Sequence, residues 1–153
     1  MGSTREDGAT RSVTDEALKE ILESHSTVAV VGLSRNPSKD SYRVAEYLQS
    51  QGYRIVPVNP VAEEILGEKS YSSLLELSDE LKRAVGIVDI FRPSEAVLPF
   101  VEDAIKLREE YGAPHVVWMQ LGIVNEEAAE KAWNAGMTVI MDRCIKVEHQ
   151  RLL

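Results

Sequence analysis

Residues 28–42 read VAVVGLSRNPSKDSY, and a helical pattern then leads to a second apolar run, GYRIVPVNP, at residues 52–60. Continuous β-branched runs of this kind are typical of strands that are covered on both faces. A buried strand, a polar loop, a helix and a second strand form the opening unit of a nucleotide-binding α/β domain. This stretch therefore predicts an α/β fold with a ligand near the loop.

The loop after the first strand departs from the dinucleotide-binding fingerprint G-x-G-x-x-G in two places. The second glycine of the fingerprint lets the backbone approach a pyrophosphate, and Ser34 stands at this position. The acidic residue that hydrogen-bonds the ribose of NAD is absent from the end of the second strand, where the chain reads Asn59-Pro60. The loop also carries Arg35 and Lys39. We therefore expect a phosphate-bearing ligand other than NAD.

The chain has 153 residues, of which 44% are hydrophobic and 27% are charged, so we expect a globular protein. The formal net charge of −8 argues against a nucleic-acid or membrane surface, because both require a broad basic face. No apolar run reaches membrane-spanning length. Cys144 is the single cysteine, which suits a reducing cytoplasm. We expect a cytoplasmic protein with a disordered tail at residues 1–12 and a single domain at residues 13–153.

Hydrophobic patterning predicts five strands that alternate with helices, at residues 27–31, 54–58, 84–91, 115–119 and 137–141. Further helical segments are expected at residues 61–66, 71–77 and 93–111, with a polar break at residues 78–80. Alternation of buried strands with helices predicts a Rossmann-like, three-layer, doubly wound parallel sheet of about five strands.

The ends of the helices carry residues with characteristic roles. Three expected N-caps are Thr14, Ser41 and Asn125. Three expected stops are Gly52, Gly112 and Gly136. Because an uncovered helix N-terminus offers N–H groups and partial positive charge to an anion, the loop at residues 32–41 is a candidate phosphate site.

Polar residues, glycines and prolines gather at the carboxyl ends of all five expected strands. In a doubly wound sheet a ligand binds beyond these ends. The segments that follow the strands are Gly32 to Arg35, Asn59-Pro60, Phe91 to Pro93, Gln120 to Gly122 and Asp142 to Cys144. We therefore expect a single cleft at this edge of the sheet.

Four segments of the chain together resemble the stand-alone CoA-binding proteins, whose domain is similar to the CoA-binding domain of the succinyl-CoA synthetase alpha subunit. The segments are VVGLSRNPSKDSYRVAEYL, GYRIVPVNP, IVDIFRPSEAV and VVWMQLGIVNEEAAEKAWNAGMTVIMDRCIKVEH. They cover most of residues 27–149 in the order of the family. The resemblance implies a Rossmann-like domain that binds coenzyme A or an acyl-CoA and is not an enzyme in its own right.

The resemblance also implies which part of the ligand each strand end would contact. Gly32, Leu33 and Ser34 would face the pyrophosphate, and Ser41 would donate to a phosphate. Asn59 and Pro60 would line the nucleotide cleft. Phe91, Arg92 and Pro93 would lie against the adenosine, and Gln120 and Gly122 would border the pantetheine. Arg35 and Lys39 would supply positive charge, which suits the 3′-phosphate that CoA carries and NAD lacks.

Several alternatives remain open at this point. The loop at residues 32–41 could be a solvated loop before a capped helix, and Arg43 could simply be exposed. An NADP-dependent oxidoreductase could use the same cleft, because Arg35 could reach a 2′-phosphate. Cys144 could carry acyl-CoA chemistry or form a mixed disulfide with the CoA thiol, but a buried small residue is the simpler interpretation.

We expect the remaining candidates for chemistry to have structural roles. We expect Trp118 to lie in the core and Asp89 to be a buried acceptor for neighbouring backbone groups. His25, His115 and His149 lie far apart in the sequence and lack metal-ligand spacing, so no metal site is expected. A homodimer is the generic expectation for a small cytoplasmic α/β protein.

Overall fold

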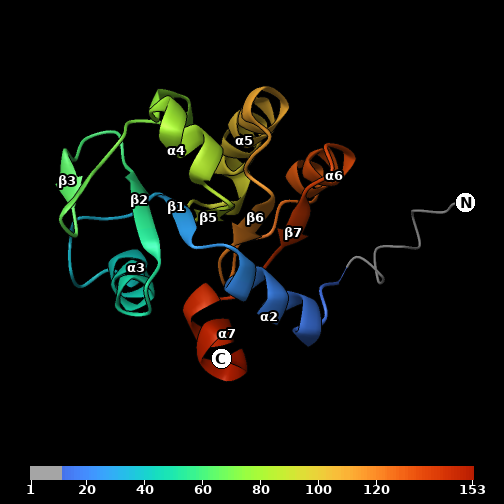
Figure 1. The fold of residues 1–153 in the computed structure, drawn as a ribbon, viewed down its shortest axis with the longest axis horizontal. Helices are drawn as coiled ribbons and strands as arrows, with labels where there is room; N and C mark the ends of the chain where they lie inside the picture. Colours follow the sequence, from blue (N-terminus) through green and yellow to red (C-terminus); the bar gives the residue numbers. More distant parts are fainter. Residues whose placement is uncertain (1–11) are drawn as a thin grey trace, which may run out of the picture.

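The centre of the protein is a five-stranded parallel sheet, shown edge-on between two layers of helices in Figure 1. The computed structural model describes residues 12–153. In spatial order the strands are β2 (Arg54–Val58), β1 (Thr27–Val31), β5 (Ile87–Ile90), β6 (Val116–Met119) and β7 (Thr138–Ile140). All four pairings are parallel. The predicted doubly wound α/β architecture is confirmed.

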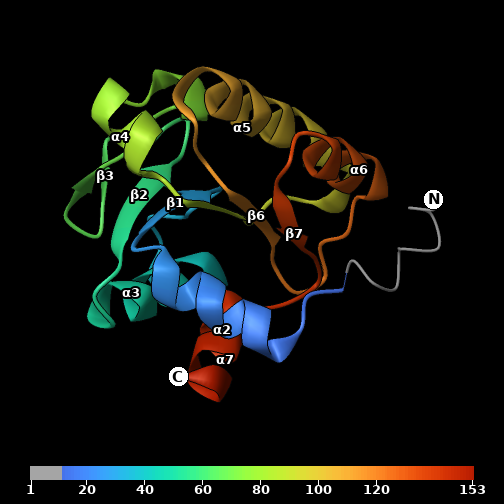
Figure 2. The ribbon, with the colours of Figure 1, turned by 45° about the vertical axis from the view of Figure 1, so that its right-hand side comes forward.

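Within residues 12–153, helices cover both faces of the sheet (Figure 2). One layer contains α2 (Asp15–Ser24), α3 (Asp40–Ser50) and α7 (Ile145–Leu152), and the other contains α4 (Asp79–Ala84), α5 (Leu98–Tyr111) and α6 (Glu126–Asn134). Each layer closes over its own buried apolar cluster. Because side chains alternate along a strand, β1 sends Val28 and Val30 to the first cluster and Ala29 and Val31 to the second. This double burial explains why the strands are continuously apolar in sequence.

The chain leaves β1 and β5 toward opposite faces of the sheet. The helix α3 follows β1 in one layer, and α5 follows β5 in the other. Neighbouring strands whose connections diverge in this way open a crevice at their carboxyl ends. The fold therefore places a cleft between the loops that follow β1 and β5.

Most of the expected helix ends are confirmed. The side chains of Thr14 and Asn125 accept hydrogen bonds from the backbone at the starts of α2 and α6. Gly112 ends α5 in the left-handed conformation, and Gly52 and Gly136 follow the ends of α3 and α6 with positive φ. The terminal residues 1–11, which carry most of the expected tail, lie outside the described part of the chain.

The segment at residues 61–66 is not the expected helix. It contributes to a hairpin of β3 (Glu64–Ile65) and β4 (Glu68–Lys69), which pair antiparallel. The two residues between these strands, Leu66 and Gly67, have φ of 56° and 77°. Two consecutive positive φ angles are what a tight hairpin turn requires, and the glycine makes this conformation accessible.

Two further expectations are wrong between residues 71 and 91. Only Leu74–Glu76 forms a helical turn, a 3-10 helix, within the segment 71–77. The expected polar break is the start of α4, because Ser78 accepts from Leu81 N–H and caps that helix. The third strand of the sheet, β5, consequently begins at Ile87 rather than at residue 84. The helix α7 had no counterpart among the sequence expectations.

Candidate functional site

A cavity of about 360 Å³ lies at the carboxyl ends of β1 and β2, beside the loop after β5. Three of the predicted strand-end segments contribute to its wall. The lining residues are Val31, Gly32, Ser34, Val58, Asn59, Pro60, Ser72, Arg92 and Phe100. The sequence analysis missed Ser72 and Phe100. Residue 72 follows Tyr71, which bridges to Val58 at the end of β2, and no local pattern signals this pairing.

Gly32 forms the tightest point of the wall. Its φ is 82°, and its N–H donates to the Val58 carbonyl at 2.9 Å. A Cβ added at Gly32 would lie 2.5 Å from the Phe91 carbonyl oxygen. Because L side chains rarely adopt this φ and the Phe91 backbone cannot give way, only glycine fits here. The loop after β1 and the end of β5 are thereby held in direct contact.

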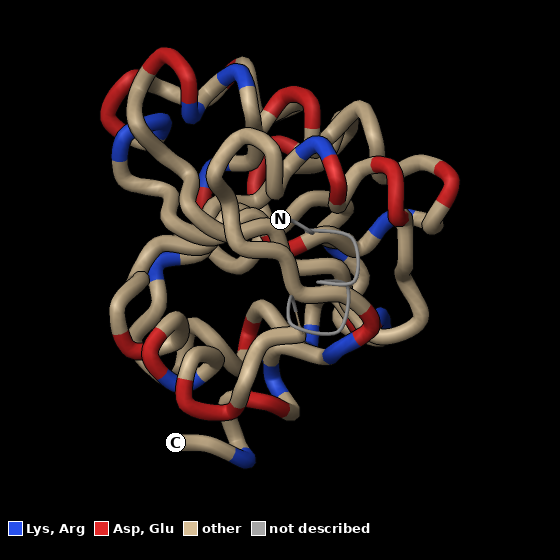
Figure 3. Tube along the Cα trace, turned by 90° about the vertical axis from the view of Figure 1, so that its right-hand side faces the viewer, with Lys and Arg blue, Asp and Glu red and all other residues tan. Residues whose placement is uncertain are grey.

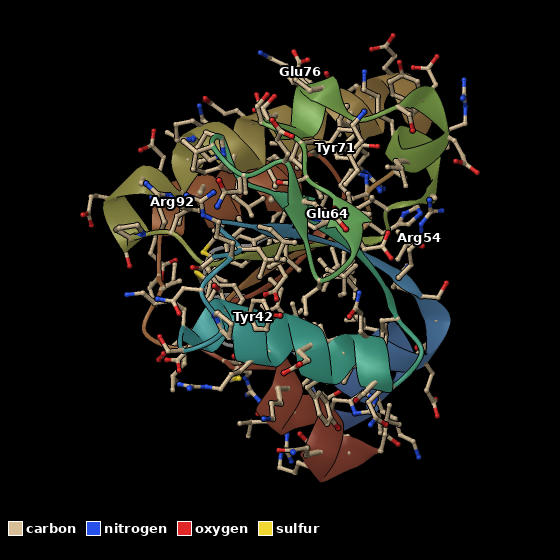
Figure 4. The ribbon with its side chains drawn as sticks, turned by 90° about the vertical axis from the view of Figure 1, so that its left-hand side faces the viewer. Tyr42, Arg54, Glu64, Tyr71, Glu76 and Arg92 are labelled. Atoms are coloured by element: carbon tan, nitrogen blue, oxygen red, sulfur yellow. The ribbon has the colours of Figure 1, made fainter. Side chains whose placement is uncertain are left out.

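Arg92 extends across this contact with its charge uncompensated. Its Cδ would lie 3.0 Å from a Cβ at Gly32, so the side-chain stem crosses the glycine. Among residues 12–153, no hydrogen bond or ion pair engages the exposed guanidinium. Figure 4 shows Arg92 and Tyr42 at one end of the sheet and Arg54 at the opposite end. A free guanidinium beside a cavity is well placed to bind a phosphate.

The loop between β1 and α3 is held by its own side chains. Ser34 N–H donates to Ser41 Oγ at 3.0 Å, and Asn36 N–H donates to Ser34 Oγ at 3.0 Å. Ser38 N–H donates to Asn36 Oδ1 at 2.9 Å. These bonds fix the loop without a ligand, so the carboxyl edge is largely preformed.

Ser41 is not the N-cap of α3. The helix begins at Asp40, and Lys39 occupies the N-cap position without a side-chain cap. Ser41 lies inside the first turn, where its buried hydroxyl accepts from Ser34. The expectation failed because the hydroxyl stabilises the preceding loop instead of its own helix. The first turn of α3 therefore keeps N–H groups and positive partial charge that no side-chain cap neutralises.

The other basic residues of this loop are exposed. Arg35 and Lys39 do not line the cavity, although they lie on the loop that does. Arg43 is 55% exposed and pairs with Asp40 at 2.9 Å, which confirms the interpretation of Arg43 as a surface residue. A surface pair of this kind contributes at most about 1 kcal/mol to stability.

Asn59 ties the ends of β1 and β2 together. Its Nδ2 donates to the Leu33 carbonyl at 2.9 Å, and its Oδ1 accepts from the N–H groups of Val61 and Ala62. The Leu33 side chain is fully buried and packs in the core below the loop. Asn59 therefore shapes the cavity wall, and the exposed Pro60 forms its rim.

The predicted residues at the end of β6 lie outside this cavity. Gln120 is 4% exposed, and its Oε1 accepts from Ile145 N–H at 3.1 Å, which caps α7. Gly122 N–H donates to Asp142 Oδ1 at 2.7 Å. Both contacts join the end of β6 to the segment after β7. Among the residues after β5, Phe91 is half-buried against the α3 layer and Pro93 is exposed.

The remaining candidates have mixed outcomes. Trp118 is fully buried as expected, with Nε1 donating to the Arg143 carbonyl. Cys144 is half-buried before α7 and packs against the core. The expectation for Asp89 is wrong, because neither of its buried carboxyl oxygens has a hydrogen-bond partner.

The histidines are closer together than their sequence positions suggest. The rings of His25 and His115 stack with centroids 5.5 Å apart. Burial, and to a smaller extent His115, lowers the pKa of His25. Within residues 12–153 no group of three or more His, Cys, Asp or Glu side chains could hold a metal ion. This pair lies at the amino end of the strands, away from the cavity.

Comparison with known proteins identifies the family to which this architecture belongs. Residues 26–150 match the family model described as the CoA binding domain. The chain belongs to this family. Over 132 residues it is 45% identical to the uncharacterized protein YneT of Bacillus subtilis, covering 86% of this chain and 91% of that protein. The sequence-based resemblance to stand-alone CoA-binding proteins is confirmed.

The chain also matches part of a larger enzyme. It is 30% identical over 130 residues to the alpha subunit of ADP-forming acetate–CoA ligase II of Pyrococcus furiosus. This match covers 78% of the chain but 27% of the ligase subunit. The chain therefore corresponds to about a quarter of that subunit.

Solved structures of two prokaryotic proteins share the whole fold. A hypothetical protein from Pyrococcus horikoshii has a TM-score of 0.84 at 39% identity, with 93% of this chain and 94% of that chain covered. A protein from Thermus thermophilus has a TM-score of 0.83 at 38% identity, with coverage of 92% and 100%. Across residues 12–153, this CoA-binding-domain protein has no helix long and apolar enough to cross a membrane.

Proposed function

We propose that the protein binds coenzyme A or an acyl-CoA in the cleft at the carboxyl ends of β1, β2 and β5, without catalysis of its own. The observation that carries this proposal is the Arg92 guanidinium, which has no hydrogen-bond or ion-pair partner among residues 12–153 and whose side chain lies across Gly32 on the wall of the cavity. Family membership supports the ligand class, and the cavity supports the proposed place of binding. The loop shape and the free cation both suit a phosphate-rich ligand.

The phosphates would lie between the loop after β1 and Arg92. The left-handed Gly32 brings backbone close to the cavity, and the first turn of α3 lacks a side-chain cap. Ser41 would donate its hydroxyl proton to a phosphate while its oxygen accepts from Ser34 N–H. Arg35 and Lys39 would supply further charge for the 3′-phosphate. The acidic chain as a whole would discourage nonspecific binding of polyanions.

The rest of the ligand would extend along the same edge of the sheet. Phe91, Arg92 and Pro93 would border the adenosine, with Asn59 and Pro60 opposite. Gln120 and Gly122 would lie on the pantetheine side, where the exposed Leu121 offers apolar surface. Gln120 would contribute through its amide nitrogen, because its oxygen caps α7. This path places the thiol end toward the loops that follow β6 and β7.

We infer a binding role without chemistry because the chain matches only part of the ligase subunit. The match corresponds to 27% of the ligase alpha subunit, so we do not transfer the ligase activity. The protein would instead hold, sense or deliver CoA in the cytoplasm, with a partner protein or as a homodimer. Nothing in the cavity favours the oxidoreductase alternative.

Calorimetric titration with CoA, dephospho-CoA, NADP and ATP tests this proposal. We expect CoA to bind, with dephospho-CoA weaker because it lacks the 3′-phosphate. Arg92→Gln should weaken CoA binding by about tenfold, which is the loss of roughly one charge-assisted hydrogen bond. Arg54→Gln is the matched control, because Arg54 is an exposed arginine at the opposite end of the sheet. Binding of NADP without CoA would contradict the proposal.

A further inference from the structure

Asp89 is a buried carboxyl group at the centre of the molecule. It lies on the central strand β5, where the register pairs it with Val30 of β1 and Trp118 of β6. Both partners belong to the apolar cluster beneath α2, α3 and α7. The residue has no exposed surface. Asp89 therefore faces an apolar layer from the middle of the sheet.

Neither oxygen of this carboxyl group has a hydrogen-bond partner. The polar groups of its neighbours are engaged elsewhere. Trp118 Nε1 donates to the Arg143 carbonyl at 2.8 Å, and Gln120 Oε1 accepts from Ile145 N–H. A buried carboxylate without a partner is costly, whereas a neutral carboxylic acid costs much less. The geometry therefore favours the protonated form.

The helices packed on this face bring no compensating charge to Asp89. On α7, Glu148 is paired with Arg143 and Arg151, and His149 is hydrogen-bonded to Tyr47 of α3 at 2.7 Å. The buried residues of α2 are both leucines. The buried residues of α3 are Ser41, Val44, Ala45 and Leu48.

Other titratable side chains belong to or pack against the same apolar cluster: Tyr53 before β2, Tyr42 and Tyr47 of α3, and Cys144 before α7. None of them is hydrogen-bonded to Asp89. Burial raises the pKa of Asp89 well above its usual range, with no contribution from a neighbouring charge.

We propose that Asp89 is a proton-operated switch, held as a neutral acid in the folded protein, whose ionisation loosens the sheet beneath the cleft. The cleft wall begins two residues further on, where Phe91 N–H donates to the Val31 carbonyl at 2.9 Å. The same wall includes the close contact between Phe91 and Gly32. An ionised Asp89 would draw water or a cation into this part of the core. Alkaline conditions would therefore weaken the junction that shapes the cleft.

Protonation of Asp89 couples folding to pH in a defined direction. The unfolded carboxylate has lost its proton above about pH 4, so folding takes up one proton from solvent. Between the unfolded and folded pKa values, the unfolding equilibrium constant contributed by Asp89 rises about tenfold per pH unit. This stabilisation is complete below the unfolded pKa and is lost as pH rises through the folded pKa. The effect needs no ligand, so it is separable from the proposed CoA binding.

Urea unfolding from pH 4.5 to 8.5 tests the switch in the ligand-free protein. We expect the wild-type unfolding constant, divided by that of Asp89→Asn, to rise about tenfold per pH unit and then level off at the folded pKa. Asp103→Asn is the control, because burial also raises the pKa of Asp103, which lies on the outer helix α5 and retains solvent contact. The wild-type unfolding constant divided by that of Asp103→Asn should change far less with pH. A ratio that is constant for Asp89→Asn would overturn the proposal.

A second measurement does not depend on whether an amide is tolerated at position 89. Infrared spectra of the folded wild-type protein at pH 7 should contain a protonated-carboxyl band that disappears on unfolding in urea. Asp89→Leu, which removes the group without leaving a buried polar atom, should lack the band. Absence of the band from the folded wild-type protein at pH 7 would contradict a neutral Asp89.

Discussion

The two ends of the sheet use arginine in opposite ways. At the amino end, Arg108 of α5 is saturated: it donates to the carbonyls of Ala135, Pro114 and Gly136 and contacts His115 Nδ1, at 3.0–3.2 Å. At the carboxyl end, Arg92 has no such partner among the described residues. A saturated cation stabilises the fold, whereas an unsaturated cation beside a cavity is available to a ligand. The comparison separates the structural end of the molecule from its binding end.

The charge pattern of the surface supports the same separation. Acidic and basic positions are interspersed along the chain in Figure 3. A ligand anion would therefore depend on local groups at the cleft and not on a broad basic face. This makes the individual contacts at the carboxyl end testable one at a time.

The largest expected loss of stability comes from adding a side chain at Gly32, where the loop after β1 contacts the end of β5. Gly32→Ala should destabilise the protein by about 3 kcal/mol, because the left-handed backbone and the contact with Phe91 O both oppose a Cβ. Gly67→Ala is the matched control, since its φ is 77° and a Cβ there would meet nothing within 4 Å. It should cost about 1 kcal/mol. Equal losses in urea unfolding would show that the contact with Phe91 is unimportant.

Alanine substitutions of Arg108 and Arg92, made one at a time, should show which arginine stabilises the fold. Arg108→Ala should cost about 2 kcal/mol of stability, because three backbone carbonyls lose a charged donor. Arg92→Ala should change stability by less than about 0.5 kcal/mol, because no hydrogen bond or ion pair with residues 12–153 is lost. Thermal unfolding of both variants measures the difference. A comparable loss in Arg92→Ala would place that residue among the structural groups.

A smaller effect is expected within the loop after β1. Ser41→Ala removes the acceptor of Ser34 N–H and should cost about 1 kcal/mol. Ser38→Ala is a suitable control, because it removes only the exposed hydrogen bond from Ser38 Oγ to Asn36 Oδ1 and keeps the bond from Ser38 N–H to the same oxygen. Urea unfolding should distinguish the two variants. Identical stability of Ser41→Ala and wild type would mean that the buried hydroxyl does not hold the loop.

The amino end should also respond to acid. Burial lowers the pKa of His149 and is the main cause of the lowered pKa of His25. A depressed folded pKa gives stability that is present above the unfolded pKa of about 6.5 and lost as pH falls through the folded pKa. The thermal midpoint of the wild type, minus that of His149→Gln, should therefore decrease between pH 7 and pH 5, because the opposite contribution of Asp89 is common to both proteins and cancels. Unchanged pH dependence in that variant would exclude His149 as a cause.

The sequence predicted the parts of the fold that depend on local pattern. Strands such as residues 27–31 and 54–58 were found with correct bounds, because double burial makes each strand continuously apolar. The caps at Thr14 and Asn125 were also found, because a capping side chain bonds to a backbone N–H within three residues of it. The hairpin at residues 64–69 was missed, because VAEEIL permits a helical pattern and only the turn at Leu66-Gly67 excludes it.

The candidate site was predictable only as a set of strand ends. The sequence identified Gly32, Ser34, Asn59, Pro60 and Arg92, which the fold brings to one cavity. It could not show that Gln120 caps α7 or that Ser72 and Phe100 complete the wall, because these contacts join distant segments. Asp89 was misjudged for a related reason: whether a buried carboxyl finds a partner depends on neighbouring strands and not on its own segment.

The most direct test of the central claim is an amide chemical-shift titration of the ¹⁵N-labelled protein with CoA. We predict that saturating CoA shifts the backbone amides at the carboxyl end, including Gly32, Ser34, Ser41 and Arg92, and leaves His25, His115 and Gly136 at the amino end unchanged. Shifts confined to the amino end, or none at CoA concentrations that saturate related CoA-binding proteins, would contradict the assignment of the cleft.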